Sequence, residues 1–294
     1  MIGGQAATRG RVIDRLEIDT HAFTFTARAA GPADGRRVLL LHGFPQTSWC
    51  WRAQLSALGN AGYRAVAPDQ RGYCAGARPP AVADYAVGHL VGDVIALADA
   101  MEMDTFDLVG HDWGGLLAWV VAARHAGRVR SLAVASTPHP LALRHALMGG
   151  DPKQARRSRH TDAFRRPAEP ERLLLGEDGT GSGLRDLLAE AGLPDADGRE
   201  YVSVLTEPGA LEAALNWFRA MGDGGLGDLP LVKVPTLYVW SSGDAALGKS
   251  AAEASANFVA GPYQFVVLDG VSHWIPEMAP EELSRLLLAH LAST

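Results

Sequence analysis

Short apolar runs alternate with helix-like segments along most of this 294-residue chain, and this alternation limits the fold more than any other feature. Strand-like runs lie at 38–41, 64–68, 106–109, 131–135, 235–240 and 264–268, and helix-like segments lie at 54–61, 85–101 and 116–124. Strands that are joined through helices pair in parallel. The sequence therefore predicts an α/β fold with a mostly parallel, doubly wound sheet.

The two ends of the chain add to this pattern. Alternating residues at 11–19 and 21–28 predict a hairpin before the first buried strand. A helix is predicted to close the chain, because three leucines recur at helical spacing: Leu283, Leu287 and Leu291.

The alternation stops between residues 141 and 229, where no buried strand-like run occurs. This segment holds helical pieces, an arginine-rich patch at 156–166 and a Gly/Asp-rich stretch at 176–183. We therefore expect an α/β core built from residues 1–140 and 230–294. A helical cap domain, residues 141–229, is expected to be inserted between the two halves of its sheet.

Composition excludes several classes of partner. Hydrophobic residues make up 47% and charged residues 20%, and the net charge is -6 without a basic run, which argues against nucleic acid. No apolar run approaches the length of a membrane span, and residues 1–11 lack the apolar region of a signal peptide. The two cysteines, Cys50 and Cys74, do not form a disulfide framework, so a cytoplasmic location is expected.

A sharp turn is expected where the strand-like run 106–109 meets the following helix. Residues 110–114 read GHDWG, which has the outline of the G-x-S-x-G nucleophile elbow with Asp112 in place of serine. A carboxylate is ionised at neutral pH and suits displacement at a saturated carbon, which leaves an ester on the chain. Asp112 is therefore the candidate nucleophile. The alternative is that Asp112 merely caps the helix.

An ester on Asp112 would need a base to release it. In the chain order nucleophile, acid, histidine, only His273 follows a late apolar strand and lies in a loop. Asp244 follows the run 235–240, and open α/β sheets place their sites at the carboxyl ends of strands. Asp269 is the rival acid, in an Asp-Gly turn near His273. We favour Asp244 as the group that orients His273.

Hydrolysis of an ester also forms an oxyanion, which needs N–H donors set in place beforehand. One donor is expected from Trp113, the residue after the candidate nucleophile. The other is expected from Phe44, in the segment HGFP at 42–45 that ends an early strand.

Together these segments resemble the epoxide hydrolase and haloalkane dehalogenase branch of the α/β-hydrolase fold, and soluble epoxide hydrolases most closely. The matching segments follow the order of that family: HGFP at 42–45, DQRGY at 69–73, GHDWGG at 110–115, GD at 243–244 and GVSHW at 270–274. The resemblance implies an Asp-His-Asp triad of Asp112, His273 and Asp244, a helical cap and a cis Phe44–Pro45 bond. It implies no cofactor and no metal, because water is the cosubstrate.

One part of the family pattern differs. Epoxide hydrolases of this branch resemble one another in two cap tyrosines that hold the leaving epoxide oxygen. Here His160 stands at the first position, and Phe218 stands at the second, in LNWFR at 215–219. Phe218 cannot donate a hydrogen bond, so His160 and Tyr201 are the candidate donors. The alternative for His160 is a solvated side chain on an arginine-rich helix.

Three functions stay open at this point. The first is hydrolysis of an epoxide to a diol, and the second is haloalkane or haloacid dehalogenation by the same triad, with the Trp113 indole holding the halide. The third is a non-catalytic, ligand-binding homologue. A small apolar organic substrate is indicated by apolar and aromatic cap residues: Phe164, Trp217, Phe218 and 173–175. The sequence leaves the oligomeric state open, a homo-oligomer included.

Overall fold

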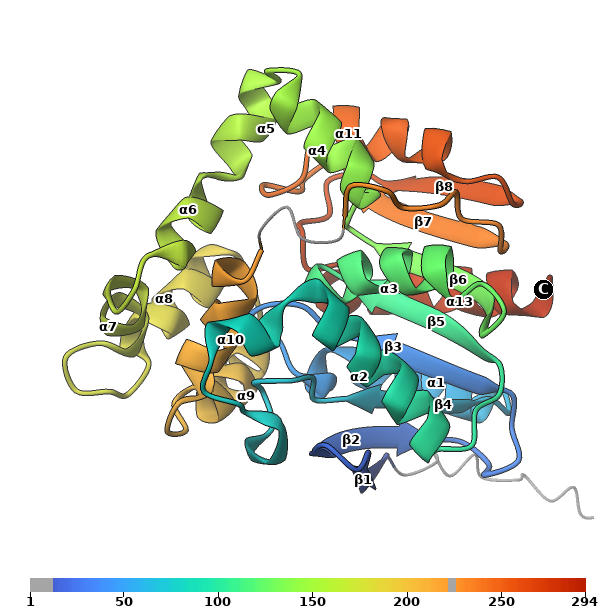
Figure 1. The fold of residues 1–294 in the computed structure, drawn as a ribbon, viewed down its shortest axis with the longest axis horizontal. Helices are drawn as coiled ribbons and strands as arrows, with labels where there is room; N and C mark the ends of the chain where they lie inside the picture. The colour runs from blue at the N-terminus through green and yellow to red at the C-terminus, as the bar shows by residue number, and fades with distance from the viewer. Residues whose placement is uncertain (1–12, 222–225) are drawn as a thin grey trace, which may run out of the picture.

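The computed structural model describes residues 13–221 and 226–294, and an eight-stranded sheet forms its centre (Figure 1). The strands are β1 (Asp14–Asp19), β2 (Thr24–Ala30), β3 (Arg37–Leu41), β4 (Arg64–Pro68), β5 (Phe106–His111), β6 (Val129–Ala135), β7 (Thr236–Ser241) and β8 (Tyr263–Leu268). Their order in the sheet is β1-β2-β4-β3-β5-β6-β7-β8. The β1–β2 and β2–β4 pairs are antiparallel and the others are parallel, which confirms the predicted α/β fold.

The predicted hairpin corresponds to β1 and β2, which pair from Asp14 with Ala29 to Asp19 with Thr24. Residues 11 and 12 of that prediction lie outside the described part of the chain. Each of the other strand-like runs forms a strand, and β5 is buried at all six positions. A strand that is buried on both faces is typical of the middle of a parallel sheet, where helices cover both sides.

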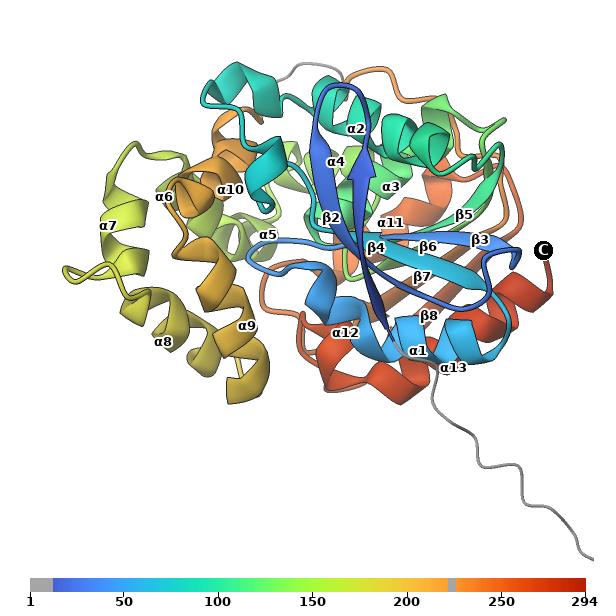
Figure 2. The ribbon, with the colours of Figure 1, turned by 90° about the horizontal axis from the view of Figure 1, so that it is seen from below.

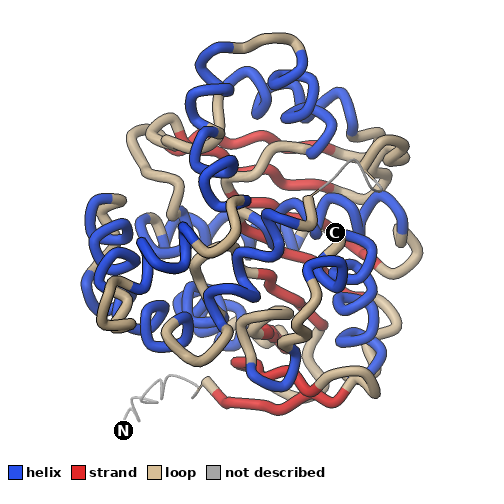
Figure 3. The backbone as a smooth tube through the Cα atoms, turned by 60° about the vertical axis from the view of Figure 1, so that its left-hand side comes forward, coloured by secondary structure: helices blue, strands red, loops and turns tan. Residues whose placement is uncertain are grey.

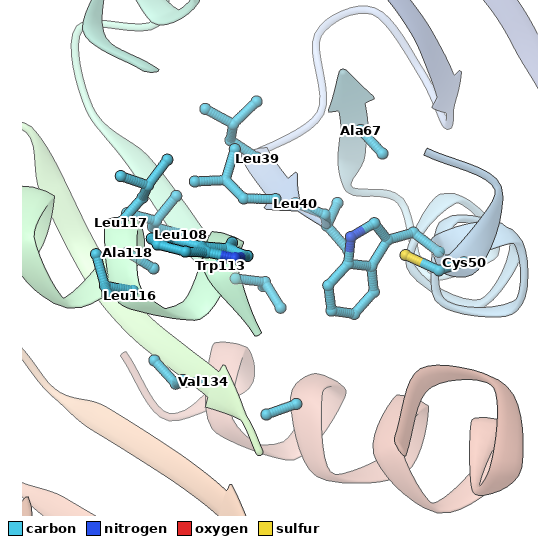
Figure 4. Close-up of a cluster of buried hydrophobic side chains, with 14 of the residues drawn as sticks. Leu39, Leu40, Cys50, Ala67, Leu108, Trp113, Leu116, Leu117, Ala118 and Val134 are labelled. Carbon is cyan, nitrogen blue, oxygen red and sulfur yellow. The ribbon is translucent and has the colours of Figure 1, made fainter. Parts of the chain in front are cut away.

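Helices cover the two faces of the sheet (Figure 2). One face carries α1 (Arg52–Asn60) and α13 (Pro280–Ala292), and the other carries α2 (Val87–Ala100) and α3 (Trp113–Arg124). Leu283, Leu287 and Leu291 of α13 are buried, as their spacing predicts. Figure 4 shows part of the single buried cluster that joins these layers, with side chains from β3, β5 and α3. This core fixes the strand ends on which the site is built.

Between β6 and β7, the described residues (136–221 and 226–235) form seven helices: α4 (Pro140–Met148), α5 (Pro152–Arg157), α6 (Arg159–Arg165), α7 (Glu169–Leu175), α8 (Ser182–Glu190), α9 (Asp195–Leu205) and α10 (Ala210–Arg219). Figures 1 and 3 show them gathered beyond one end of the sheet. The described residues of this segment contain no strand. The helical content of 141–229 thus agrees with the prediction, while its assignment as a separate cap domain stays a prediction. Across 13–221 and 226–294, no helix combines the length and apolar character that a membrane crossing requires.

Candidate active site

Asp112 lies in the turn between β5 and α3 with φ 50° and ψ -120°. This conformation is unfavourable for a residue with a side chain, so its surroundings must hold it in place. Tight packing does so, because a Cβ atom on Gly114 would lie 2.1 Å from the carbonyl oxygen of Leu41. Asp112 stands at the N-cap position of α3, but its side chain makes no capping hydrogen bond. The capping interpretation therefore does not account for the carboxylate.

The two oxygens of the Asp112 carboxylate have different neighbours. Oδ1 accepts a hydrogen bond from the backbone N–H of Phe44 at 2.8 Å. Oδ2 lies 3.5 Å from Nε2 of His273. The backbone oxygen of Asp112 accepts from the Thr137 hydroxyl at 2.8 Å, which ties the turn to the end of β6. One carboxylate oxygen is thus held by a backbone donor and the other faces the candidate base.

The Phe44 donor comes from the loop after β3, and the Phe44–Pro45 peptide bond is cis, as the resemblance implies. Gly43 brings this loop against the elbow, since a Cβ atom at Gly43 would lie 2.2 Å from the Cβ of Asp112. The second expected donor, the N–H of Trp113, begins α3 directly after the carboxylate. Its contact with an oxyanion stays a prediction.

His273 and Asp244 meet as expected. His273 Nδ1 lies 2.8 Å from Oδ2 of Asp244, whose other oxygen accepts from the backbone N–H groups of Ala246 and Leu247 at 2.7 and 2.8 Å. The buried Asp244 carboxyl thus has three hydrogen-bond partners, and one of them is the candidate base. The rival Asp269 is exposed and accepts instead from the Ser242 hydroxyl at 2.6 Å. The structure therefore places Asp244, and not Asp269, against the histidine.

Asp112 and His273 form an ion pair in the free site. Burial favours the neutral acid at Asp112, but the hydrogen bond and charge of His273 outweigh it and lower the Asp112 pKa to about 2. Burial likewise disfavours charge on His273, but Asp244 and Asp112 outweigh it and raise the His273 pKa to about 10. At neutral pH the carboxylate is ready to attack, whereas the histidine still carries a proton.

Asp112 and His273 open onto a cavity of about 400 Å³ between the sheet and the helices above it. Its walls are mainly apolar, and they include several large side chains that the sequence analysis did not single out: Leu116, Leu143, Leu187, Met221 and Trp274. These residues come from five separate parts of the chain, and nothing in the local sequence of any one of them signals the shared wall. The cavity is large enough for an organic molecule of drug-like size.

Three of the predicted cap residues line this cavity: His160, Phe164 and Phe218. The Phe218 ring lies edge-on to the rings of Phe44 and Trp113, both at 5.1 Å between centroids. Phe164 lies 5.2 Å from Phe44, and the ring of His160 lies 5.8 Å from Phe164. His160 is largely exposed, and its Nδ1 lies 2.8 Å from the carbonyl oxygen of Arg157. Both interpretations of His160, cavity lining and solvated, thus hold in part.

Two other cap residues require a correction, because Tyr201 and Trp217 do not line the cavity. The Tyr201 hydroxyl donates to Oε1 of Glu277 at 2.6 Å, within the protein interior. The Trp217 indole N–H donates to the carbonyl oxygen of Arg71 at 2.9 Å. Phe218, next to Trp217, does reach the cavity, so the Trp217 error lies in the rotation of α10, whereas no residue of α9 lines the cavity at all. Among the described residues that line the cavity, none is a tyrosine.

Comparisons with known proteins agree with this architecture. The alpha/beta hydrolase fold family matches residues 36–280. Epoxide hydrolase A of Mycobacterium tuberculosis is 31% identical over 96% of this chain and 98% of its own length. The AB hydrolase superfamily protein YfhM of Bacillus subtilis is 32% identical over 93% and 96%.

Solved structures give the same result. Epoxide hydrolase A from Mycobacterium thermoresistibile superimposes with a TM-score of 0.81 at 26% identity, covering 96% of this chain and 98% of that one. Epoxide hydrolase VrEH1 from Vigna radiata gives 0.79 at 25% identity, covering 97% and 99%. The chain belongs to the α/β-hydrolase fold family. Within that family it is a hydrolase of the epoxide hydrolase type.

Proposed function

We propose that this enzyme opens an apolar epoxide to a vicinal diol through an ester formed at Asp112. The observation that carries the proposal is that the two oxygens of the Asp112 carboxylate have different neighbours. Phe44 donates to one oxygen, and the other faces His273, which Asp244 supports. This arrangement supplies a nucleophile, an oxyanion donor and a base at one end of an apolar cavity.

In the first step, Oδ2 of Asp112 attacks a ring carbon of the epoxide. A C–O bond forms to the enzyme, and the ring C–O bond breaks with its electron pair on oxygen. That oxygen needs a proton. His160 is the cap side chain proposed to supply it as an imidazolium, in which Nδ1–H donates to the Arg157 carbonyl and Nε2–H gives its proton to the substrate oxygen.

Ester formation also prepares the second step. The Asp112 charge is one of the causes that raise the His273 pKa, and the ester removes it. His273 then releases its proton, which replaces through solvent the proton that His160 gave up, and the neutral imidazole accepts a proton from the water whose oxygen attacks the ester carbon. Phe44 and Trp113 are proposed to stabilise the oxyanion through their N–H groups, and Asp244 stabilises the imidazolium. Collapse breaks the acyl C–O bond, and the diol oxygen takes the proton from His273. The second hydrogen of the water then passes from the Asp112 carboxyl to His273, which restores the ion pair.

The helices α4–α10 are proposed to act as the cap, since His160, Phe164 and Phe218 of this segment close the cavity over Asp112. The substrates proposed are small apolar organic epoxides and water. No nucleic acid, membrane, metal or cofactor takes part in the proposed reaction, and a cytoplasmic location is proposed with it.

Dehalogenation is the second candidate, because no tyrosine lines the described part of the cavity and halide loss needs no phenol. Product analysis separates the two. With styrene oxide and 1-bromobutane offered at equal concentration, the proposal predicts faster diol formation than bromide release. Faster bromide release would contradict epoxide hydrolysis as the main reaction and would support dehalogenation.

Isotope labelling tests the ester route itself. When enzyme in excess over styrene oxide reacts once in water enriched in ¹⁸O, the label should enter the carboxyl group of Asp112, because water attacks the ester carbon. Peptide mass spectrometry after digestion locates the label. Label found only in the diol would show direct attack of water on the epoxide.

A further inference from the structure

A buried chain of polar contacts joins the helices above the site to the backbone of the candidate base. Tyr201 Oη lies 2.6 Å from Oε1 of Glu277, and the same oxygen lies 2.6 Å from the side-chain amide of Gln46. The other end of that amide lies 2.7 Å from His111 Nδ1, and His111 Nε2 lies 2.9 Å from the carbonyl oxygen of His273. All five residues are buried.

The four contacts need four hydrogens, one each. Tyr201 supplies one from its hydroxyl. Gln46 supplies one, because its amide offers NH₂ to one neighbour and oxygen to the other, whichever way it is turned. A neutral His111 supplies one. The carbonyl of His273 supplies none, so one contact lacks a hydrogen when Glu277 is ionised.

We propose that Glu277 and His111 share one buried proton through the amide of Gln46, and that this proton positions the His273 loop beneath the cap helices. With the proton on Glu277, the acid donates to the Gln46 oxygen, the Gln46 NH₂ donates to His111 Nδ1, and His111 Nε2–H donates to the His273 carbonyl. With the proton on His111, the amide is turned as it is in the structure, where Gln46 Nε2 donates to Glu277 and Gln46 Oε1 accepts from His111 Nδ1 and, at 3.3 Å, from the Gly43 N–H. Glu277 acts through Gln46 and His111 and is a positioning residue.

The surroundings favour Glu277 as the holder of the proton. Burial raises the Glu277 pKa to about 7, whereas burial lowers the pKa of His111 to about 4, helped by the charge on His273. Oε2 of Glu277 is buried without a partner in the described residues, which costs less for a neutral acid than for a carboxylate.

The groups packed around Glu277 add no positive charge at close range. Burial raises the pKa values of Tyr201 and of the Cys50 thiol, so both stay neutral at physiological pH. The negative charge of Asp197 on α9 raises the Glu277 pKa further. Arg52 is the nearby cation, and it is committed to Asp197 at 2.8 Å. The protein therefore keeps this carboxyl in its acid form up to neutral pH.

Loss of the proton breaks one link. Two acceptors then face each other in the chain, and the His273 carbonyl loses the His111 donor while it keeps the Ser136 hydroxyl at 2.7 Å and the Ile275 N–H at 2.9 Å. His273 carries the base, so the loop that holds it would be less well fixed as the pH rises. The expected effect on turnover rests on the proposed function, whereas the location of the buried proton does not depend on it.

Glu277→Gln is the direct test. In this variant an NH₂ group takes the place of the shared Glu277 oxygen, and it can donate one hydrogen to Gln46 and one to Tyr201 at every pH. The folded wild type holds a proton that the unfolded chain releases at the ordinary glutamate pKa, so its stability should fall as the pH rises toward and through 7. Urea unfolding between pH 5 and 7 gives the number of protons released on unfolding from the pH slope of the free energy of unfolding. Wild type should release close to one proton per molecule more than Glu277→Gln does.

Two further arms complete the experiment. Glu281→Gln, at an exposed position on α13, should keep the wild-type slope. In infrared difference spectra at pH 6, wild type minus Glu277→Gln should contain the carbonyl band of a protonated carboxyl group. The ratio of kcat for Glu277→Gln to kcat for wild type should rise as the pH passes 7, with KM unchanged.

Equal pH slopes of stability in wild type and Glu277→Gln, or a carboxylate signal in place of the acid band, would overturn the shared proton. Equal kcat profiles would overturn the positioning role. Absence of any epoxide turnover in wild type would instead contradict the proposed function, and the unfolding and infrared results would still decide where the proton lies.

Discussion

At the scale of single residues, the site depends on an aspartate whose backbone few side chains tolerate. Asp112 has φ 50°, and close packing of Gly114 and Gly43 keeps it there. The sequence predicted this residue because an elbow motif carries its own local context of strand, turn and helix. It also predicted His273 and Asp244, since each follows a strand whose carboxyl end meets the same edge of the sheet.

The role of Asp244 can be separated from that of its rival. Asp244→Asn cannot stabilise an imidazolium, so we expect ester hydrolysis to slow by roughly 10⁴-fold, the scale for such a change in a catalytic triad. Ester formation should be much less affected, since Asp112 attacks on its own. Rapid-mixing kinetics with styrene oxide would then show a burst followed by almost no turnover.

The matched control is Asp269→Asn, which alters only an exposed contact with Ser242. It should leave kcat within about twofold, as expected for a surface change. A larger loss in Asp269→Asn than in Asp244→Asn would reverse the assignment of the acid.

At the scale of elements, the core was predictable and the side-chain directions of the cap were not. Strands such as β5 are buried along their whole length, and their apolar runs are visible in the sequence. The position of α9 and the rotation of α10 are set by contacts with distant segments. Tyr201 turns toward Glu277 and Trp217 toward Arg71, and neither partner is near in sequence. The Gln46, His111 and Glu277 chain escaped prediction for the same reason.

Helix α6 carries His160, the side chain that is proposed to protonate the epoxide oxygen. His160→Phe keeps the ring that packs near Phe164 but removes the proton, so we expect the rate of ester formation to fall roughly 10²-fold, the lower end for general acid catalysis. His160→Tyr restores a phenol at this position and should retain most of that rate. Stopped-flow measurement of tryptophan fluorescence during a single turnover follows this step.

The control is His145→Phe in α4, whose ring packs against Phe258 and does not line the cavity. This variant should behave as wild type. An unchanged rate of ester formation in His160→Phe would remove His160 from the mechanism and leave solvent as the proton source.

At the scale of the whole molecule, the Asp112 and His273 pair links stability to pH. The lowered Asp112 pKa, about 2, contributes stability above the ordinary aspartate pKa that is lost as the pH falls through 2. The raised His273 pKa, about 10, contributes stability below the ordinary histidine pKa that is lost as the pH rises through 10. Both contributions are fully present between the two ordinary values, at about pH 4 to 6.5.

Comparison with Asp112→Asn isolates this pair. The difference in free energy of unfolding between wild type and Asp112→Asn should be most favourable to wild type at about pH 4 to 6.5 and should shrink steadily toward pH 10. Urea unfolding across that range measures it. A difference that does not vary with pH would mean that the two groups are not coupled in the folded protein.

The central claim is that Asp112 forms an ester with the substrate and that His273 removes it. His273→Gln keeps Asp112 and the Phe44 donor but lacks the base, so styrene oxide should accumulate as an adduct. Intact-protein mass spectrometry should show the mass of one epoxide added, and digestion should place it on the peptide that contains Asp112. An unmodified His273→Gln protein, under conditions where wild type converts styrene oxide to the diol, would contradict the account.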